Sequence, residues 1–481
     1  MKLRRTTIYF LSLIAGLSVS AQSVLSNQSA AADMEEQVFI HYLAWYGEGS
    51  DGNHWADGTA QEPIVGFYNS QSWSTHLYHI LLSSAVGVDG LVVNVRTDYD
   101  EVSLKKVLPS LQRIVDIDAD FDYKLAVSYD DQDMTLESVK SELEVLKSDI
   151  IGGTSQYLHL NEEPVIFIWN YDGFLTSEEY REAVTATFPD NSPVLLRNEI
   201  DFNTTEDAID SYYPWVQGFD EKGENWGEGY LDWYYRTLQI REDIEFATAG
   251  AWPGFDDRSA SWGQNRWIDR KEGETFQQTW DLIHKYQTES AIKWVILETW
   301  NDWNEGTEIE PSKEHGFTYV TKTAENIGTF KGESYPVNDT LFSASTKIYL
   351  AAQMIESGER DSAEFYPYFE DAVASFIEKD PLSTIATLEE IFNPTVALTT
   401  QALSADINVY PNPSSGVVNI LVPQKEVNVS IHDASGKIIY TQSVDGEVDN
   451  AIQWDAKSRK GFFFIEISEG EESIVKRVLI K

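Results

Sequence analysis

The sequence contains no cysteine among its 481 residues. Disulfide bonds, thiolate nucleophiles, cysteine-ligated zinc and iron–sulfur clusters are therefore excluded, so the fold has to be stabilised by burial of apolar side chains. Basic residues are also scarce: 35 Lys and Arg stand against 79 Asp and Glu, a formal net charge of −44. A polyanion of this size repels phosphate backbones and anionic lipid surfaces, which excludes nucleic acid as a partner.

Long hydrophobic runs are missing as well. The apolar run at residues 8–19 has 12 residues, fewer than the ~20 needed to span a bilayer, so we expect no membrane insertion. It follows a basic segment, residues 2–5, and ends at a small-residue cleavage pattern, residues 19–21. This order predicts a secretory signal peptide over residues 1–21, in preference to a membrane anchor, followed by an N-terminal tether over residues 22–36.

The remaining composition is that of a folded protein, with 42% hydrophobic, 13% aromatic and 24% charged residues. Residues 394–405 form a polar linker, and turn residues separate the short strand-like runs that follow it. The pattern predicts a small all-β sandwich over residues 406–481. Its predicted strands are 407–410, 417–422, 427–432, 437–443, 462–468 and 473–480.

Three short motifs in this segment occur in a fixed order: Val-Tyr-Pro-Asn-Pro at 409–413, Ile-His-Asp-Ala-Ser-Gly-Lys at 431–437, and Lys-Arg-Val-Leu-Ile-Lys at 476–481. They resemble the C-terminal sorting domain of the type IX secretion system of Bacteroidetes. The resemblance implies export across both membranes with the type IX machinery as partner, and a secreted or cell-surface location. A carbohydrate-binding sandwich is the alternative for this unit.

The preceding segment, residues 37–393, alternates short β-branched or aromatic runs with stretches of helical periodicity. Eight such runs predict an α/β fold, a (β/α)8 TIM barrel. We expect helices at 74–86 and 104–115, and the eighth barrel helix at 345–356, with 361–379 and 382–392 packed nearby. The predicted strands are 38–42, 90–95, 124–128, 164–169, 193–196, 211–216, 245–249 and 294–298.

Carboxylates and aromatic side chains crowd the positions that follow these strands, where the loops of such a barrel converge on one mouth. Aromatic rings stack on the apolar faces of sugars, and carboxylates bind sugar hydroxyls, so the mixture favours a carbohydrate site over ordinary packing under loops. The rim segments are 44–47, 52–55, 130–131, 170–172, 197–199, 252–257 and 299–306.

Asp302 and Glu305 are three residues apart just after the eighth predicted strand. A helical turn there would put both carboxylates on one side. Cleavage of a glycosidic bond needs such a pair, one carboxyl protonated and one ionised. The alternative is that both only compensate a helix dipole, with Asp302 as the cap.

The sequence Trp-Asn-Asp-Trp-Asn-Glu-Gly-Thr-Glu-Ile-Glu-Pro at 300–311, with Gly-Phe-Asp-Asp-Arg at 254–258, resembles the family 99 glycoside hydrolases, endo-acting α-mannosidases in a clan with the family 71 α-1,3-glucanases. The resemblance covers the barrel. It implies that Asp302 deprotonates the substrate's own 2-hydroxyl and that Glu305 protonates the leaving group, with retention through a 1,2-anhydro sugar. An α-mannoside suits this route because its axial 2-oxygen lies anti to the leaving group.

Further residues of these motifs and of the rim are expected to line the substrate site. Asp302 stands where the family has Glu, and Asn304 where it has His, which leaves two alternatives: an inverting α-glucanase of the family 71 type, or a non-catalytic glycan-binding protein. The eight His show no metal-ligand spacing, so we expect no metal and no cofactor. The expected substrate-binding residues are Trp45, Tyr46, His54, Trp55, Asp130, Tyr213, Trp252, Asp256, Asp257, Arg258, Asn265, Arg266, Trp300, Asn301, Trp303 and Glu310.

Overall fold

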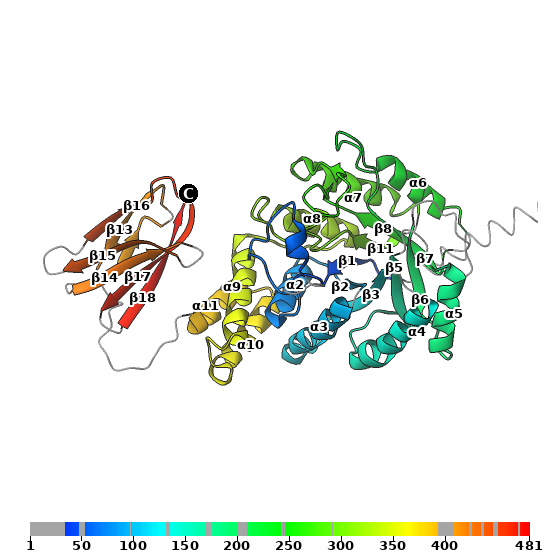
Figure 1. Cartoon of the computed structure of the whole chain (residues 1–481), viewed down its shortest axis with the longest axis horizontal. Helices are drawn as coiled ribbons and strands as arrows, with labels where there is room; N and C mark the ends of the chain where they lie inside the picture. The colour runs from blue at the N-terminus through cyan, green and yellow to red at the C-terminus, as the bar shows by residue number, and fades with distance from the viewer. Residues whose placement is uncertain are drawn as a thin grey trace, which may run out of the picture. The chain divides into compact units, whose positions relative to one another are not determined.

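The chain divides into two units, Met1–Pro394 and Thr395–Lys481, each with its own hydrophobic core (Figure 1). The predicted signal peptide and linker lie outside the described residues, as does most of the predicted tether. The computed structural model describes residues 34–47, 53–96, 98–130, 135–169, 175–199, 209–241, 244, 246–290, 292–392, 407–412, 414–422, 426–433, 437–445, 451–469 and 472–481.

The first unit is built on eight parallel strands, in the order β7-β6-β5-β3-β2-β1-β11-β8, with helices outside them (Figure 1). This confirms the predicted α/β barrel. The sheet is buried on both faces, which is why its strands read as nearly continuous apolar runs. The barrel strands are β1 (Gln37–Leu43), β2 (Gly90–Val95), β3 (Lys124–Asp130), β5 (Glu163–Trp169), β6 (Val194–Glu199), β7 (Ser211–Pro214), β8 (Ala247–Ala251) and β11 (Ile292–Leu297).

The barrel is nearly closed, and side chains join β7 to β8 across the remaining seam. Ser211 Oγ donates to the carbonyl oxygen of Phe246 at 2.7 Å, and Thr248 Oγ1 donates to the carbonyl oxygen of Tyr212. Gly250 is required here because a Cβ would lie 2.7 Å from the Pro214 ring. The seam therefore relies on small and hydroxyl side chains.

Alternate strand residues fill the barrel interior. Phe39 and Trp294 meet edge to face in its apolar part, with ring centroids 5.1 Å apart. Nearer the carboxyl ends, the inward positions are His41 on β1 and, beyond Ile296, Glu298 just after β11, both buried. The interior thus changes from apolar to polar as it approaches the mouth.

Helices surround the strands and supply the outer half of the core. Two short strands form a hairpin after β8, β9 (Phe255–Asp256) and β10 (Trp267–Ile268), and β4 (His159–Leu160) pairs antiparallel with β5. The helices described between β1 and β11 are α2 (Trp73–Ala85), α3 (Asp98–Ile117), α4 (Leu136–Val145), α5 (Ser177–Thr187), α6 (Glu228–Leu238) and α7 (Glu274–Tyr286), with the short helices η1 (His54–Asp57), η2 (Leu146–Ile150), η3 (Ile151–Gly153) and η4 (Lys271–Gly273).

The prediction that residues 345–356 form the eighth barrel helix is wrong. The helix that follows β11 is α8 (Thr318–Lys331), and the expected segment belongs to the next one, α9 (Asp339–Glu356). The buried face of α8 includes Thr323 and Asn326, and these polar residues obscure its apolar period. α9 packs instead beside α2, where the rings of Tyr78 and Tyr349 lie 5.4 Å apart. The two expected flanking helices are present as α10 (Ser362–Ile377) and α11 (Pro381–Phe392).

The second unit is an all-β sandwich, as predicted, with two antiparallel sheets ordered β12-β13-β16 and β15-β14-β17-β18. The sequence reading missed β16, whose Ile452 and Trp454 point into the core while their neighbours are exposed. Two apolar positions in five residues are a weak signal. The strands are β12 (Asn408–Tyr410), β13 (Val417–Leu421), β14 (Glu426–His432), β15 (Ile438–Asp445), β16 (Ala451–Asp455), β17 (Gly461–Glu469) and β18 (Glu472–Ile480).

Within the described ranges, none of the helices combines the length and the apolar character that crossing a bilayer requires.

Candidate active site

The candidate site lies on the loop that follows β11, at the carboxyl end of the barrel. Local hydrogen bonds define the shape of this loop. The Thr299 N–H donates to the Thr307 carbonyl at 3.0 Å, and the Asp302 N–H donates to Thr299 Oγ1 at 2.8 Å. The Trp300 N–H donates to the carbonyl of His41 on β1 at 2.7 Å, which ties the loop to the barrel.

Asp302 and Glu305 lie on one tight turn. The Glu305 N–H donates to Asp302 Oδ1 at 2.9 Å. Asp302 is 4% exposed, whereas 19% of the Glu305 side chain is exposed. Asp302 therefore does cap this turn, and the same bond holds its carboxylate beside Glu305. Asp302 can therefore cap the turn and lie near Glu305 at the same time.

The two carboxyl groups differ in acidity. Burial raises the pKa of Asp302 to about 6, opposed by hydrogen bonds from the backbone of Glu305 and Asn304. Burial and, after it, the charge of Asp302 together raise the pKa of Glu305 to about 8, and the charge of Arg266 opposes the shift. Both groups lose solvent, but Glu305 has the higher pKa because it also lies near the charge of Asp302, whereas Asp302 accepts hydrogen bonds that stabilise its ionised form. These shifts favour a single proton on the pair at neutral pH, carried by Glu305.

Arg266 provides the positive charge nearest to this pair. Its guanidinium lies 3.7 Å from Glu305 Oε1 and 2.8 Å from Asp257 Oδ2. The rings of Phe219 and Phe255 pack against it at 5.1 Å and 4.9 Å. Asp257 is fully buried and also accepts from the Arg266 N–H at 2.7 Å. Asp257 thus holds Arg266 in place beside the acid.

The loop that carries β9 and β10 is hydrogen-bonded to the turn. The Asp256 N–H donates to the Glu305 carbonyl at 2.5 Å, and the Asp256 carboxylate pairs with Arg258 at 2.6 Å. Gly306 has a φ of 59°, and a Cβ there would lie 3.0 Å from the Asp256 nitrogen, so both conformation and space require glycine. Asn265, also left-handed at a φ of 59°, is exposed.

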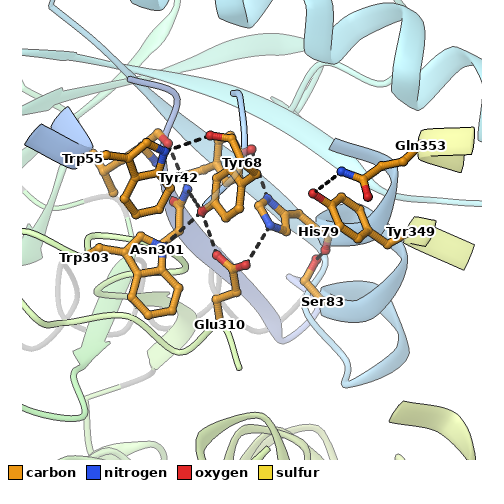
Figure 2. Close-up of polar contacts among 11 residues, drawn as sticks. Tyr42, Trp55, Tyr68, His79, Ser83, Asn301, Trp303, Glu310, Tyr349 and Gln353 are labelled. Atoms are coloured by element: carbon orange, nitrogen blue, oxygen red, sulfur yellow. Dashed lines mark hydrogen bonds and ion pairs between the residues drawn. The ribbon is translucent and has the colours of Figure 1, made fainter. Parts of the chain in front are cut away.

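A buried hydrogen-bond network holds the end of the loop (Figure 2). The Tyr68 hydroxyl donates to Glu310 Oε2 at 2.8 Å and accepts from Asn301 Nδ2 and Trp303 Nε1, each at 3.1 Å. His79 Nε2 lies 3.1 Å from Glu310 Oε1. Asn301, Trp303 and Glu310 were all expected to contact substrate. The structure instead places them inside this network, at most 2% exposed.

Several other expected contact residues are also buried. Trp300 is enclosed beside His79, with ring centroids 5.8 Å apart. Trp252 donates its indole N–H to the Trp226 carbonyl at 3.1 Å. Tyr213 donates to the Ile168 carbonyl at 3.1 Å inside the barrel. All three side chains are fully enclosed by protein.

The segments after β1 and β3 bring the remaining expected residues to the rim. The rings of Trp45 and His54 lie 4.8 Å apart, and both are partly exposed. Asp130, at the end of β3, lies 3.8 Å from Arg96 and belongs to the groups whose charge raises the pKa of Glu305.

The rim residues are linked to the turn that carries Asp302 and Glu305 by backbone and side-chain contacts. Tyr46 is buried and donates to Asn304 Oδ1 at 3.1 Å. Trp55 stacks on it at 4.1 Å. The Asn304 amide in turn donates to the carbonyls of His54 and Gly58, each at 2.9 Å.

Sequence reasoning missed a second ionisable pair beneath the loop. His41 Nδ1 lies 2.7 Å from Glu298 Oε2, and both side chains are at most 1% exposed. Burial raises the pKa of Glu298, opposed by His41. The signal was available: His41 is two residues from Phe39 on β1, and Glu298, just after β11, continues the alternation of Trp294 and Ile296, so both were expected to face the barrel interior. Tyr68 and His79 lie far from the loop in sequence and carried no such signal.

Across the described ranges, His, Asp and Glu side chains form no cluster able to hold a metal ion.

Comparisons with known proteins agree with the two-unit organisation. One family model, described as a secretion system C-terminal sorting domain, matches residues 408–481. A second, described as a domain of unknown function (DUF5010), matches residues 154–327. No curated protein matches the chain.

Solved structures are similar to the first unit. The GH99 endo-alpha-mannosidase from Bacteroides thetaiotaomicron matches in complex with bis-tris-propane, at 18% identity and a TM-score of 0.50, over 62% of this chain and 98% of that one. A second structure of the GH99 endo-alpha-mannosidase from that organism matches at 16% identity and a TM-score of 0.51, over the same shares. The barrel is therefore similar in fold to GH99 endo-α-mannosidases, and the C-terminal unit matches a sorting domain, which indicates export.

Proposed function

We propose that this protein is an exported endo-acting glycoside hydrolase that cleaves α-linked, manno-configured polysaccharide with retention. Asp302 is the base and Glu305 the acid. One observation carries the proposal: two carboxyl groups sit on a single turn at the end of the eighth barrel strand, and their environments set one pKa near 6 and the other near 8. At neutral pH the pair supplies one acceptor and one donor of a proton, which acid–base cleavage needs.

The first step forms one bond and breaks one. The Asp302 carboxylate takes the proton of the substrate's 2-hydroxyl, and the 2-oxygen attacks C1 from the face opposite the leaving group. The C1–O bond to the next sugar breaks, and the Glu305 carboxyl gives its proton to the departing oxygen. A 1,2-anhydro sugar, a protonated Asp302 and an ionised Glu305 result.

The second step returns both side chains to their starting state. Glu305 takes a proton from water, the water oxygen attacks C1, and the C1–O2 bond opens while Asp302 reprotonates the 2-oxygen. Two inversions at C1 give net retention. Manno configuration is required because its axial 2-oxygen can reach the back of C1, which an equatorial oxygen cannot.

The surrounding residues position this chemistry. Arg266 limits how far the Glu305 pKa rises, and the Tyr68–Glu310 network holds the loop that carries the pair. Among the expected substrate contacts, the partly exposed side chains of Trp45, His54 and Trp55 are the ones available for stacking. The proposal includes export by the predicted signal peptide and the type IX machinery.

Incubation of the purified protein with a panel of α-mannans, β-mannans and α-glucans tests the function. We expect new reducing ends only from α-mannans, and NMR of the first products should show the α-anomer. The β-anomer as first product, from an α-glucan, would support the inverting α-glucanase instead. Binding measured by calorimetry without any turnover would support a non-catalytic glycan-binding protein.

A further inference from the structure

The short helix η1 (His54–Asp57) connects the candidate active site to two exposed aromatic side chains. Its first residue, His54, packs against Trp45 and accepts from the Asn304 amide next to Glu305. Its other residues contact two different loops of the rim. The contacts of η1 therefore place the exposed aromatic side chains of those loops at the edge of the site.

Phe67 is the first of the two exposed rings. It is 55% exposed and packs on Trp55 of η1 with ring centroids 4.7 Å apart. Trp55 is held from behind, since its indole N–H donates to the Tyr68 carbonyl at 2.8 Å and its ring stacks on Tyr46. Phe67 thus ends a supported aromatic stack that begins at a buried residue beside the catalytic turn.

Trp262 is the second exposed ring, at 44% exposure, on the loop between β9 and β10. The residue before it, Ser261, donates its N–H to the carbonyl of Asp57 at 2.6 Å and its hydroxyl to the Asp57 carboxylate at 3.1 Å. Gly263, after it, leaves room for the Asp257 carbonyl, which would lie 1.8 Å from a Cβ. The loop is therefore fixed on both sides of Trp262.

We propose that Phe67 and Trp262 are outer subsites that bind sugar units of a neutral glycan chain beyond the bond that is cleaved. Rigidly supported rings left in water beside a carbohydrate site suit the apolar faces of sugars. We expect the glycan chain to be neutral because the nearby guanidinium groups already pair with carboxylates of the protein. Arg96 lies 3.8 Å from Asp130, and Arg258 lies 2.6 Å from Asp256. The inference rests on the proposed function and explains how a long substrate is held.

The test compares full-length wild type with Phe67→Ala, Trp262→Ala and the double variant. Tyr368→Ala is the matched control, because Tyr368 is similarly exposed, at 42%, on α10. kcat/KM is measured on an α-mannan polymer and on a short α-manno-oligosaccharide. We expect the double variant to lose about tenfold on the polymer, from two lost stacking contacts, and less than about twofold on the short substrate. The control should match wild type on both.

A second measurement separates this inference from the proposed function: the migration of each protein in a native gel that contains the same α-mannan, which slows a protein that binds it. If wild type cleaves mannan and the double variant is unchanged on the polymer, the inference fails alone. If both substrates are affected equally, the rings have a structural role and the inference also fails. If wild type is retarded without cleaving, and the double variant is not retarded, the subsites stand while the hydrolase proposal falls. A wild type that neither cleaves nor is retarded overturns both.

Discussion

The interior of the barrel near its mouth and the interior of the C-terminal sandwich differ in what they bury. The sandwich core is apolar, formed by side chains such as Ile420, Trp454 and Ile465. The barrel buries ionisable groups at one end, including Glu298 and Asp302. Burying such groups lowers stability unless they are paired or hydrogen-bonded. The barrel therefore pairs or hydrogen-bonds the ionisable groups that it buries, and the proposed chemistry depends on these groups.

The largest effect on activity should come from removing Glu305, the proposed proton donor at the mouth of the barrel. We expect Glu305→Gln to lower kcat/KM on α-mannan by at least about 1,000-fold, because the leaving oxygen then receives no proton. Glu314→Gln is the matched control, an exposed glutamate on the same segment, and should stay within about twofold. An active Glu305→Gln variant would mean that the barrel mouth is not the site of acid catalysis.

The same variant should be more stable than wild type at alkaline pH. In the folded protein the pKa of Glu305 is raised to about 8, above about 4.3 in an unfolded chain. Wild type therefore loses stability as pH rises through this window, whereas Glu305→Gln does not. Melting temperatures at pH 5 and pH 8 check this, and the difference between the variants should grow with pH. A constant difference would contradict the raised pKa.

The network around Tyr68 should give the next largest effect, on stability. Tyr68→Phe removes the donor to Glu310 and the acceptor for Asn301 and Trp303, leaving buried polar groups without partners. We expect a loss of about 2 to 4 kcal/mol in the free energy of unfolding. Urea denaturation measures it, and Tyr368→Phe, at an exposed position, should change it by less than about 0.5 kcal/mol. Equal losses of stability in Tyr68→Phe and Tyr368→Phe would show that the buried network around Tyr68 does not stabilise the fold.

The pH dependence of kcat/KM should be bell-shaped, with limbs near 6 and 8 set by the Asp302 and Glu305 pair. Asp302 must be ionised, so activity rises through the first limb, and Glu305 must be protonated, so it falls through the second. Arg266→Met removes the charge that lowers the Glu305 pKa and should move the alkaline limb upward. Arg236→Met, whose side chain is 62% exposed on α6, should leave it in place. An alkaline limb that stays in place or moves downward in Arg266→Met would contradict the effect of Arg266 on the Glu305 pKa.

The smallest effect should come from the sandwich itself. Because the two units have separate cores, a chain ending at residue 394 should keep kcat/KM on a short α-manno-oligosaccharide within about twofold. In cells, however, the truncated protein should not reach the medium or the cell surface. Loss of activity on the short substrate would show that the second unit takes part in catalysis.

Much of the fold could be read from the sequence because it depends on local periodicity. The eight β-branched runs predicted the barrel strands to within a few residues, and turn chemistry predicted most of the sandwich. The errors fall where periodicity is weak. α8 has polar residues on its buried face, and β16 has only two inward positions.

The candidate site was predicted only in part. Asp302 and Glu305 could be singled out because three residues along one turn keep side chains together. Burial could not be predicted for Trp300, Asn301 and Glu310, since the partners that enclose them come from segments more than 200 residues away.

The sequence alone determined that two carboxyl groups stand together after the eighth strand, and that an export unit follows, because both depend on short-range order along the chain. Only the tertiary structure decided which carboxyl keeps its proton. That choice depends on desolvation, on Arg266 and Asp257 from another loop, and on the backbone N–H that reaches Asp302. These influences act through space, and chain order does not encode distance through space.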